Sequence, residues 1–405
     1  MTGPLAGLKV LDLSRVLAGP WAGQILADLG AEVIKIERPI LGDDTRGWGP
    51  PFLKGKTGKP TDAAYFISAN RNKKSVALDL ADGRGQEAAR RLAMCSDVVI
   101  ENFKRGDLAR YGLDYAGLSS LQPRLVYCSI TGFGQSGPHA DRPGYDFIIQ
   151  GMAGFMSLTG EPGGQPLRAG LAVADLTTGM YSVIAILAAL RHRDATGAGQ
   201  HIDIALFDTQ FGWLANQAQN YLVSGSSPIL TGNTHPNLVP YQVFRTATRP
   251  IIIAVGNDRQ FARLAAILGH PEWAEDTRYA LNRGRVSNRE TLVCDIEKIL
   301  QARPAAEWLP AIEAADIPVG PVNTLAEAFA DPQVEARQLL VELEHAAAGP
   351  ITTLAQPMKF SKSPPEYTSA PPVLGQHTRE VLRSVGYSDD EIATLETAGV
   401  SSQHS

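Results

Sequence analysis

The first half of the chain alternates short apolar runs with stretches of helical spacing, and no other feature limits the possible folds as strongly. The apolar runs, read as buried strands, lie at 8–13, 31–36, 75–80, 97–100, 124–130 and 202–206. Helical patterns lie between or beside them at 20–29, 83–94, 176–191 and 207–223. Strands that are separated by helices are typical of a parallel sheet with crossover helices. We therefore expect an α/β fold with a large Rossmann-like domain.

A change of composition marks the end of this domain. Residues 224–238 are rich in Ser, Gly, Pro and Asn, which is typical of a linker. Beyond the linker, the pattern predicts two strands within 239–255 and helices at 258–268, 289–302 and 306–314. The expected domains are a large one over 1–223, a linker over 224–238, a smaller α/β domain over 239–330 and a C-terminal return to the large domain over 331–405.

Composition excludes several classes of function. The net charge of the 405 residues is -5, without a stripe of Lys and Arg that would suggest a nucleic-acid partner. The three cysteines, Cys95, Cys128 and Cys294, lie far apart and read as buried thiols of a reducing compartment. The first residues lack a signal-peptide pattern, and we see no run approaching the ~20 apolar residues of a membrane span. We expect a cytoplasmic protein with no membrane partner.

Ligands of parallel sheets bind beyond the carboxyl ends of the strands, so chemistry is expected at 14–20, 37–39 and 101–103. The first of these turns carries no dinucleotide-binding glycine pattern, and Pro20 stands at its helix start. Its backbone N–H groups can face an anion, or it is a plain helix start. Three cations at 70–75, with Arg38 and Arg110, suit the phosphates of a nucleotide-like ligand, although a solvated loop has the same composition.

Asp175 follows the Gly- and Pro-rich stretch 131–172 and precedes a helix. Such a carboxylate is either an N-cap or a nucleophile, and a helix N-terminus would keep it ionised and fixed in either role. The histidines His139, His235 and His377 share no metal-ligand spacing, and no Ser lies in a Gly-x-Ser-x-Gly pattern. Metal and Ser-triad chemistry are therefore not expected.

Several segments together resemble the class III CoA-transferases, the CaiB/BaiF family, over residues 5 to about 400. They are 5–13, 18–20, 29–37, 42–46, 70–75, 101–103, 144–146, the region around Asp175, and 374–378. Within the family, 42–51, 128–138 and 239–242 look most similar to the succinyl-CoA-dependent dicarboxylate enzymes of the glutarate type. The resemblance implies two domains in an interlocked homodimer.

It also implies a CoA-transferase, which is a transferase of sulfur-containing groups. Asp175 would be the covalent nucleophile, passing through an aspartyl anhydride and an aspartyl-CoA thioester. Coenzyme A and acyl-CoA would be substrates, with no permanently bound cofactor and no metal. Backbone N–H groups near Ala18 or in the 232–237 loop would stabilise the oxyanion. The expected partners are an acyl-CoA, a carboxylic acid and a second copy of the chain.

The resemblance and the strand ends together give the expected binding residues. For CoA they are Val16, Leu17, Ala18, Arg38, Lys74, Asn102, Phe103, Arg110, Tyr145 and Asp146. For the acid substrate they are Arg46, Trp48, Arg168 and His235. Arg46 and Arg168 are the suggested partners of a distal carboxylate, because guanidinium groups bind carboxylates with two hydrogen bonds, although surface ion pairs would look the same.

Two departures narrow the substrate. The oxalate branch carries Gln where this chain has Leu17, and a run of glycines where this chain has 232–237. Both differences argue against oxalate as the acceptor acid. The racemase branch carries His where this chain has Tyr145, which removes one of the two bases that racemisation needs. Glutarate is the leading acceptor, with itaconate, mesaconate, hydroxymethylglutarate and a carnitine-like acid open. The alternative functions are an α-methylacyl-CoA racemase-like enzyme on the same fold and, less in keeping with Asp175, a non-catalytic CoA-binding protein.

Overall fold

The structure, a computed structural model, describes residues 3–403, which form two compact units. The large unit holds the residues up to Phe155, Arg168–Val223 and those from Glu335 on, and the small unit holds Met156–Leu167 and Ser224–Val334. The segment Met156–Leu167 thus differs from the expected domain limits, which gave it to the large domain. It belongs to the small unit because its backbone pairs there, as when Gly232 N–H donates to the Gly160 carbonyl at 2.9 Å.

A seven-stranded sheet forms the centre of the large unit, in the order β14-β5-β2-β1-β6-β7-β8. Six strands run parallel and the short β14 is antiparallel to β5. The expected mixed α/β fold with a mainly parallel sheet is confirmed. The strands are β1 Lys9–Asp12, β2 Glu32–Glu37, β5 Lys73–Leu78, β6 Val98–Glu101, β7 Val126–Thr131, β8 His201–Ala205 and β14 Ser401–Ser402.

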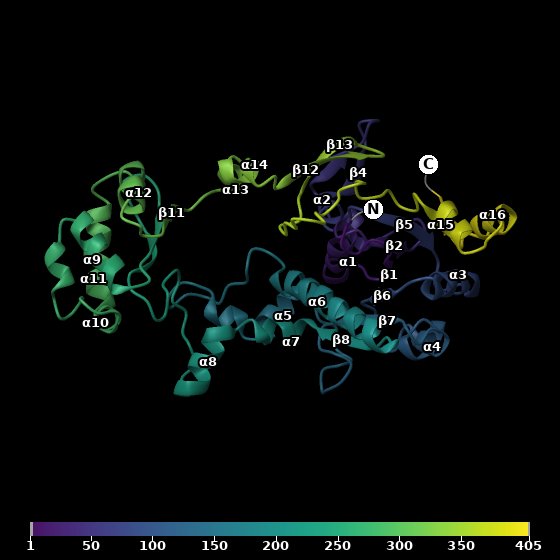
Figure 1. Cartoon of the computed structure of the whole chain (residues 1–405), viewed down its shortest axis with the longest axis horizontal. Coiled ribbons are helices and arrows are strands. Elements are labelled where there is room, and N and C mark those ends of the chain that lie inside the picture. Colours follow the sequence, from purple (N-terminus) through teal and green to yellow (C-terminus); the bar gives the residue numbers. More distant parts are fainter. Residues whose placement is uncertain (1–2, 404–405) are drawn as a thin grey trace. The chain divides into compact units, whose positions relative to one another are not determined.

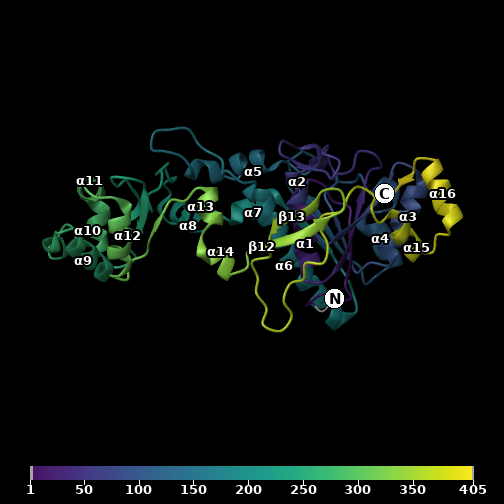
Figure 2. The same ribbon diagram turned by 90° about the horizontal axis from the view of Figure 1, so that it is seen from above.

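Helices cover both faces of this sheet (Figures 1 and 2). Neighbouring strand residues point to opposite faces, so Val10 belongs to one buried core and Leu11 to the other. The helices of the first face are α1 Ala18–Asp28, α5 Asp146–Met152, α6 Val173–Thr196 and α7 Leu206–Gly212. Those of the second face are α3 Gly83–Met94, α4 Tyr115–Leu121, α15 Thr378–Ser384 and α16 Asp389–Thr397. Gly30 directly follows the C-cap Leu29 of α1 and adopts the left-handed conformation with φ 100°, which commonly terminates a helix.

The small unit has its own core, built on an antiparallel sheet in the order β11-β10-β9. Its strands are β9 Tyr241–Phe244, β10 Ile251–Ala254 and β11 Val319–Pro321. Its main helices are α9 Asp258–Ile267, α10 Asn282–Ser287, α11 Arg289–Leu300, α12 Ala305–Glu313 and α13 Leu325–Phe329.

The remaining elements are short. They are β3 Phe52–Lys54, β4 Pro60–Ala63, α2 Ala64–Ile67, α8 Ala215–Ser224, α14 Pro332–Ala336, β12 Leu340–His345 and β13 Gly349–Leu354, with 3-10 turns at Asp44–Gly47, Ala109–Tyr111, Phe155–Leu158 and Pro271–Ala274.

Two expectations from the sequence are wrong. The single helix over 207–223 is broken into α7 and α8, where Ala215 takes a φ of 43°. Cys95 and Cys294 are exposed and only Cys128 is buried; all three are free thiols. The helix α6 has 24 residues and is long and apolar enough to cross a membrane, although half of its most apolar window is buried in the protein. Core helices of globular proteins have the same length and composition, so this is weak evidence for a span.

Candidate active site

A cleft of about 480 Å³ opens in the large unit where three neighbouring strands end. The turn after β1 contributes 15–18, the turn after β6 contributes 102–105, and the end of β7 contributes 130–132. This is the edge at which parallel sheets bind their ligands. The other lining residues are Asp107, Ala140, Asp141, Arg142, Pro143, Gly144, Tyr145, Asp175 and Leu206.

Asp175 lies in the wall of this cleft, within the first turn of α6. The expectation that it caps the helix is wrong, because the helix begins at Val173 after an Ala172 N-cap without a side-chain hydrogen bond. Asp146, at the start of α5, supplies the cap instead. Its Oδ1 accepts from the Ala174 N–H at 2.8 Å and from the Asp175 N–H at 3.4 Å. Asp146 therefore fixes the turn that carries Asp175, and a second carboxylate stands beside it.

These surroundings change the acidity of Asp175. Burial raises the pKa of its carboxyl group to about 7, and the negative charge of Asp146 adds to the rise. The expectation of a fully ionised carboxylate is wrong because the position of Asp175 at a helix start does not offset these two effects. A carboxyl group that titrates near neutrality in a cleft is a candidate for chemistry.

The turn between β1 and α1 forms another part of the lining and is strained. Val16 has a φ of 72°, a left-handed conformation that is costly for a β-branched residue. The helix that follows begins without a side-chain cap at Leu17. Within residues 3–403, the N–H groups of Leu17 and Ala18 have no hydrogen-bond partner. Two backbone donors are therefore free in the lining of the cleft.

Four cations line the cleft: Arg15, Lys104, Arg105 and Arg142. Arg15 pairs with Asp44 at 2.8 Å, and Arg105 pairs with Asp141 at 3.2 Å. The side chains of these two arginines are nearly half exposed, so the pairs are easily exchanged for a ligand. Arg15 lies within the expected segment 14–20, whereas Lys104, Arg105 and Arg142 were not predicted, because single cations in loops form no motif.

Two of the expected phosphate ligands stand close to this group without lining the cleft. Arg38 shares Asp44 with Arg15, at 2.9 Å. Arg110 pairs at 3.6 Å with Asp107, which does line the cleft. Both side chains are at least half exposed. Each is linked to a lining residue through one carboxylate: Arg38 to Arg15 through Asp44, and Arg110 directly to the lining residue Asp107.

An aromatic pair adds a further polar group near Asp175. The ring of Trp48 meets the ring of Tyr65 edge-on, with centroids 5.3 Å apart. Burial raises the pKa of Tyr65 to about 12, and the charges of Asp175, Asp146 and Asp43 contribute. The phenol of Tyr65 therefore stays protonated and lies within electrostatic reach of Asp175. Sequence reasoning missed Tyr65, which lies in no recognisable pattern.

Comparison with known proteins identifies the family. The model of CoA-transferase family III matches residues 5–378. The chain belongs to CoA-transferase family III. The resemblance stated from the sequence is thus confirmed, and the chain is a transferase that acts on CoA thioesters.

Named relatives of this family III chain cover it almost completely. It is 53% identical to the succinate–glutarate CoA-transferase of Agrobacterium fabrum, over 94% of this chain and 95% of the relative. It is 42% identical to the human succinyl-CoA:glutarate CoA-transferase, over 99% and 90%. The structure of a CaiB/BaiF family protein from Brucella suis matches with a TM-score of 0.85 and 49% identity, over 95% of this chain and 100% of that one.

Among the residues that the family III resemblance suggested, seven line the cleft. They are Val16, Leu17, Ala18, Asn102, Phe103, Tyr145 and Asp175. Asp146 lies directly behind Asp175 as its helix cap. Trp48 stands beside Tyr65. Among the described residues, no group of three or more His, Cys, Asp or Glu side chains is arranged to hold a metal ion.

The prediction that Arg46 binds the acid substrate is wrong, because its guanidinium group is bound by other groups of the protein. The side chain is buried and donates to both carboxylate oxygens of Glu37 at 2.7 Å and to Asp62 at 2.9 Å. A further hydrogen bond reaches the carbonyl of Pro372 at 3.1 Å, and these negative partners raise the pKa of Arg46. Arg46 therefore holds the fold together and has no free face for a substrate carboxylate.

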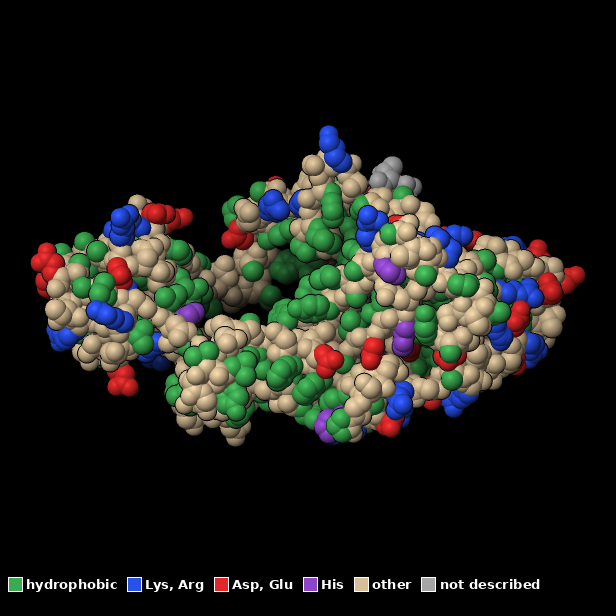
Figure 3. Space-filling view, turned by 60° about the horizontal axis from the view of Figure 1, so that its bottom comes forward, with side chains coloured by type: hydrophobic (Ala, Val, Ile, Leu, Met, Phe, Trp, Pro, Cys, Tyr) green, Lys and Arg blue, Asp and Glu red, His purple; other side chains and the backbone are tan. Residues whose placement is uncertain are grey.

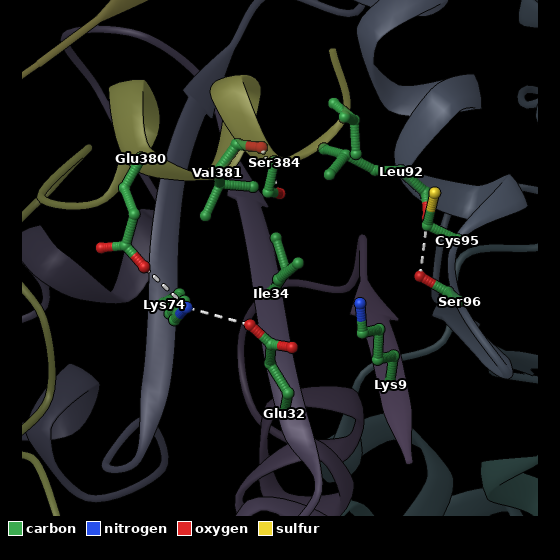
Figure 4. A pocket seen from close by; sticks show the side chains of 11 residues that line it. Lys9, Glu32, Ile34, Lys74, Leu92, Cys95, Ser96, Glu380, Val381 and Ser384 are labelled. Atoms are coloured by element: carbon green, nitrogen blue, oxygen red, sulfur yellow. Dashed lines mark hydrogen bonds and ion pairs between the residues drawn. The ribbon is translucent and has the colours of Figure 1, made fainter. Parts of the chain in front are cut away.

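The prediction that Lys74 binds CoA is also wrong. It stands at the start of β5, whereas the cleft lies where the parallel strands end, so the two are at opposite edges of the sheet. Its ammonium group lies between Glu32 at 2.9 Å and Glu380 at 2.7 Å (Figure 4). With two carboxylates around it, Lys74 has no part in the cleft.

The last two expected substrate ligands also lie outside the lining. The guanidinium group of Arg168 is exposed, donates to the Ala169 carbonyl at 3.1 Å and lies over the ring of Phe147. His235 belongs to the small unit, where its Nδ1 accepts from the N–H groups of Asn237 and Leu238 at 3.1 Å. His235 therefore orders its own loop in this structure.

Proposed function

We propose that this enzyme transfers CoA from succinyl-CoA to a dicarboxylic acid, with glutarate as the leading acceptor, through covalent intermediates on Asp175. The names of the relatives at 53% and 42% identity support this donor and acceptor. The observation that carries the mechanism is a carboxyl group with a pKa near 7 in a cleft lined by four cations and by Leu17 and Ala18, whose N–H groups have no partner within residues 3–403. Other relatives are named for oxalate, at 40% identity, and mesaconate, at 35%.

The reaction begins when the ionised carboxylate of Asp175 attacks the thioester carbonyl of the donor. The carbon–sulfur bond breaks, CoA leaves as a thiolate, and Asp175 carries a mixed anhydride with the donor acyl group. The thiolate then attacks the aspartyl carbonyl and releases the donor acid, which leaves an aspartyl-CoA thioester. The acceptor carboxylate repeats these two steps in reverse order. An activated acyl bond is kept at every stage, so the sequence needs no ATP.

Each attack places negative charge on a carbonyl oxygen. We assign its stabilisation to the N–H groups of Leu17 and Ala18, which lie at the open start of α1 and have no partner within residues 3–403. Donors that are fixed in place before the reaction stabilise such charge without reorganisation. Tyr65 is a further donor for an acid substrate, since its phenol stays protonated.

CoA itself is assigned to the cationic part of the cleft. Arg15, Lys104, Arg105 and Arg142 offer charge for its phosphates, with Arg38 and Arg110 one carboxylate away. Guanidinium groups bind phosphate through paired hydrogen bonds. Phe103 and Tyr145 offer aromatic faces, and Val16 and Leu17 offer apolar contact for the pantetheine arm.

An anhydride is lost on contact with water, so the cleft has to be covered during turnover. We propose that a second copy of the chain contributes to this cover in an interlocked homodimer. One face of α6 exposes Met180, Tyr181, Ile184 and Leu187, with Ile184 61% exposed. Hydrophobic side chains gather on the surface of the large unit (Figure 3), and apolar helix faces of this kind are normally covered by a partner.

The dimer is tested by light scattering after size exclusion. Ile184→Glu is expected to give monomers with little activity, and a fully active monomeric wild type would contradict the proposal.

A cytoplasmic location is also proposed, which the three free thiols favour.

The mechanism is tested by intact-protein mass spectrometry after mixing with succinyl-CoA. We expect an adduct that hydroxylamine removes and that Asp175→Ala does not form. Asp208→Ala is a suitable control, because Asp208 is an acid in the first turn of the short helix α7 and does not line the cleft. An unmodified wild-type mass with several acyl-CoA donors would refute the proposal, as would exchange of the α-proton without CoA transfer.

A further inference from the structure

We propose that Asn102 and Asp43 are positioning residues, whose side chains hold the strained turn at 14–17 so that the N–H groups of Leu17 and Ala18 stay in place in the cleft. The inference rests on the proposed function, because it concerns the donors assigned to the oxyanion. It assigns to Asn102 a role different from the CoA contact suggested by the sequence, and it gives a role to Asp43, which the sequence analysis did not single out.

The turn needs an external hold because Val16 does not favour its own conformation. A φ of 72° brings the Cβ of an L-residue close to its backbone, and a β-branched residue tolerates this poorly. Strained backbone of this kind persists where surrounding groups determine it, and it is concentrated at functional sites. Val16 directly precedes Leu17, so a change at Val16 would also move the donors that follow it.

Asn102 holds the residue before Val16 from both sides. Its Oδ1 accepts from the Arg15 N–H at 2.9 Å, and its Nδ2 donates to the Arg15 carbonyl at 2.7 Å. Asn102 directly follows β6, and the neighbouring strand β1 leads into the turn, so the amide ties the turn to the sheet. Both polar atoms of the amide are engaged in this way. A side chain occupied by the protein's own backbone is better suited to shaping the cleft than to binding CoA.

Asp43 holds Val16 itself. Both carboxylate oxygens lie 3.3 Å from the Val16 nitrogen, and Oδ1 also accepts from the Thr45 N–H at 3.0 Å and the Thr45 hydroxyl at 2.7 Å. Lys35 pairs with Asp43 at 2.9 Å, and neither side chain is exposed. The same ammonium group donates to the Ser14 carbonyl at 2.7 Å. Thr45 and Lys35 therefore hold the Asp43 carboxylate in one position, and its contact with the Val16 N–H limits the movement of the turn.

The pattern of hydrogen bonds along the turn is what distinguishes a positioning device from ordinary packing. The Ser14 N–H donates to Asp12 at 3.0 Å, and side chains also bind the Ser14 carbonyl, both backbone groups of Arg15 and the Val16 N–H. The next two N–H groups, of Leu17 and Ala18, are left free among the residues that the structure describes. Side chains thus hold the approach to the donors and leave the donors open.

The test replaces Asn102 by Ala and measures kcat, KM for succinyl-CoA and the melting temperature. A misplacement of about 1 Å in an active site can cost ~100-fold in rate, so we expect kcat to fall about 10- to 100-fold while KM changes less than about 3-fold. A CoA ligand would give the opposite split, with a raised KM and an unchanged kcat, and that result would overturn the inference.

A second substitution tests the strain directly. Glycine adopts the left-handed conformation without cost, so Val16→Gly should hold the turn with less help from Asn102. We expect Asn102→Ala to reduce kcat at least about 5-fold less in the Val16→Gly background than in the Val16 background. Equal losses in both backgrounds would show independent effects and would overturn the inference. In each background, the Asn102→Ala variant is compared with the parent that carries the same residue at position 16. Any direct effect of losing the Val16 side chain on kcat is therefore the same in both members of the pair and cancels.

Asn72→Ala is the matched control. The Asn72 amide also binds backbone groups and a carboxylate in the large unit, at 2.7 Å to the Glu366 carbonyl and 2.9 Å to Asp28, but it does not line the cleft. We expect a lower melting temperature with kcat within about 2-fold of wild type. If Asn72→Ala lowers kcat as much as Asn102→Ala, general destabilisation explains both losses and the inference fails.

A crystal structure of Asn102→Ala separates this inference from the proposed function. We expect Val16 to leave the left-handed region or the Leu17 and Ala18 nitrogens to move. An unchanged turn would overturn the inference even in an active transferase. A wild-type enzyme that moves no CoA would refute the proposed function, while the structure would still decide whether Asn102 holds the turn.

Discussion

The two edges of the large sheet carry charged pockets of different kinds. At the amino edge, a pocket of about 230 Å³ holds Lys74 between Glu32 and Glu380, so that opposite charges satisfy one another. At the carboxyl edge, Asp175 lies beside another carboxylate, and the turn at Val16 is strained. Reactivity therefore lies where the fold leaves a charge unpaired, and a cluster of charged side chains alone does not mark a site.

If Asp175 is the reactive group of the carboxyl edge, the rate of CoA transfer should depend strongly on pH. A pKa of about 7 leaves about 1% of Asp175 ionised at pH 5, so kcat/KM should rise about 100-fold between pH 5 and a plateau above pH 8. The measurement is initial rate against pH at low succinyl-CoA.

Asp146→Asn is the control for that profile. The amide keeps an oxygen that can cap α6 but removes the charge that raises the pKa of Asp175, so the acidic limb should move to lower pH. A profile that is flat from pH 5 to 8 in the wild type would contradict the argument.

The same pKa makes a prediction about stability. Because the folded pKa of Asp175 lies above its ordinary value of 3.8, the folded state favours the protonated acid, and this stabilisation is lost as the pH rises through about 7. Asp175→Asn has no such loss, so its advantage over wild type in urea unfolding should grow between pH 4 and pH 8. A pKa shift of this size corresponds to a change of ~4 kcal/mol in the free energy of unfolding. Because Asp175 is partly exposed in the cleft, we expect a change of about 2 kcal/mol. An advantage that does not change with pH would contradict a raised pKa.

The sequence predicted the sheet of the large unit well, because apolar runs and helix ends are local signals. It also predicted the edge at which the cleft opens, since that follows from parallel strands. It could not predict which cations are free. Among their partners, the Pro372 carbonyl that binds Arg46 and the Glu380 carboxylate that binds Lys74 are each more than 300 residues away in the sequence. Nor could it predict the helix cap of α6, because Asp146 reaches Ala174 from another helix.

Cations of the cleft should matter for binding, in contrast to those of the amino edge. Replacing Arg105 and Arg142 by Ala is expected to raise KM for succinyl-CoA about 10-fold, with kcat changed less, because phosphate contacts contribute equally to ground and transition states. Steady-state kinetics at two salt concentrations measures this, and the salt dependence of KM should weaken in the double variant. An unchanged KM would remove these arginines from the CoA site.

The smallest expected effect belongs to Lys74, the cation that the sequence placed in the CoA site. Its two ion pairs involve partly exposed side chains, so Lys74→Ala should cost no more than about 1 kcal/mol of stability. Because it lies at the other edge of the sheet from Asp175, both kcat and KM should stay within about 2-fold of wild type. Lys9→Ala, which removes the other cation of the same pocket, is the matched control. If Lys74→Ala weakened the apparent affinity for succinyl-CoA as much as the double arginine variant does, and Lys9→Ala did not, Lys74 would return to the CoA site and the two edges would act together in binding.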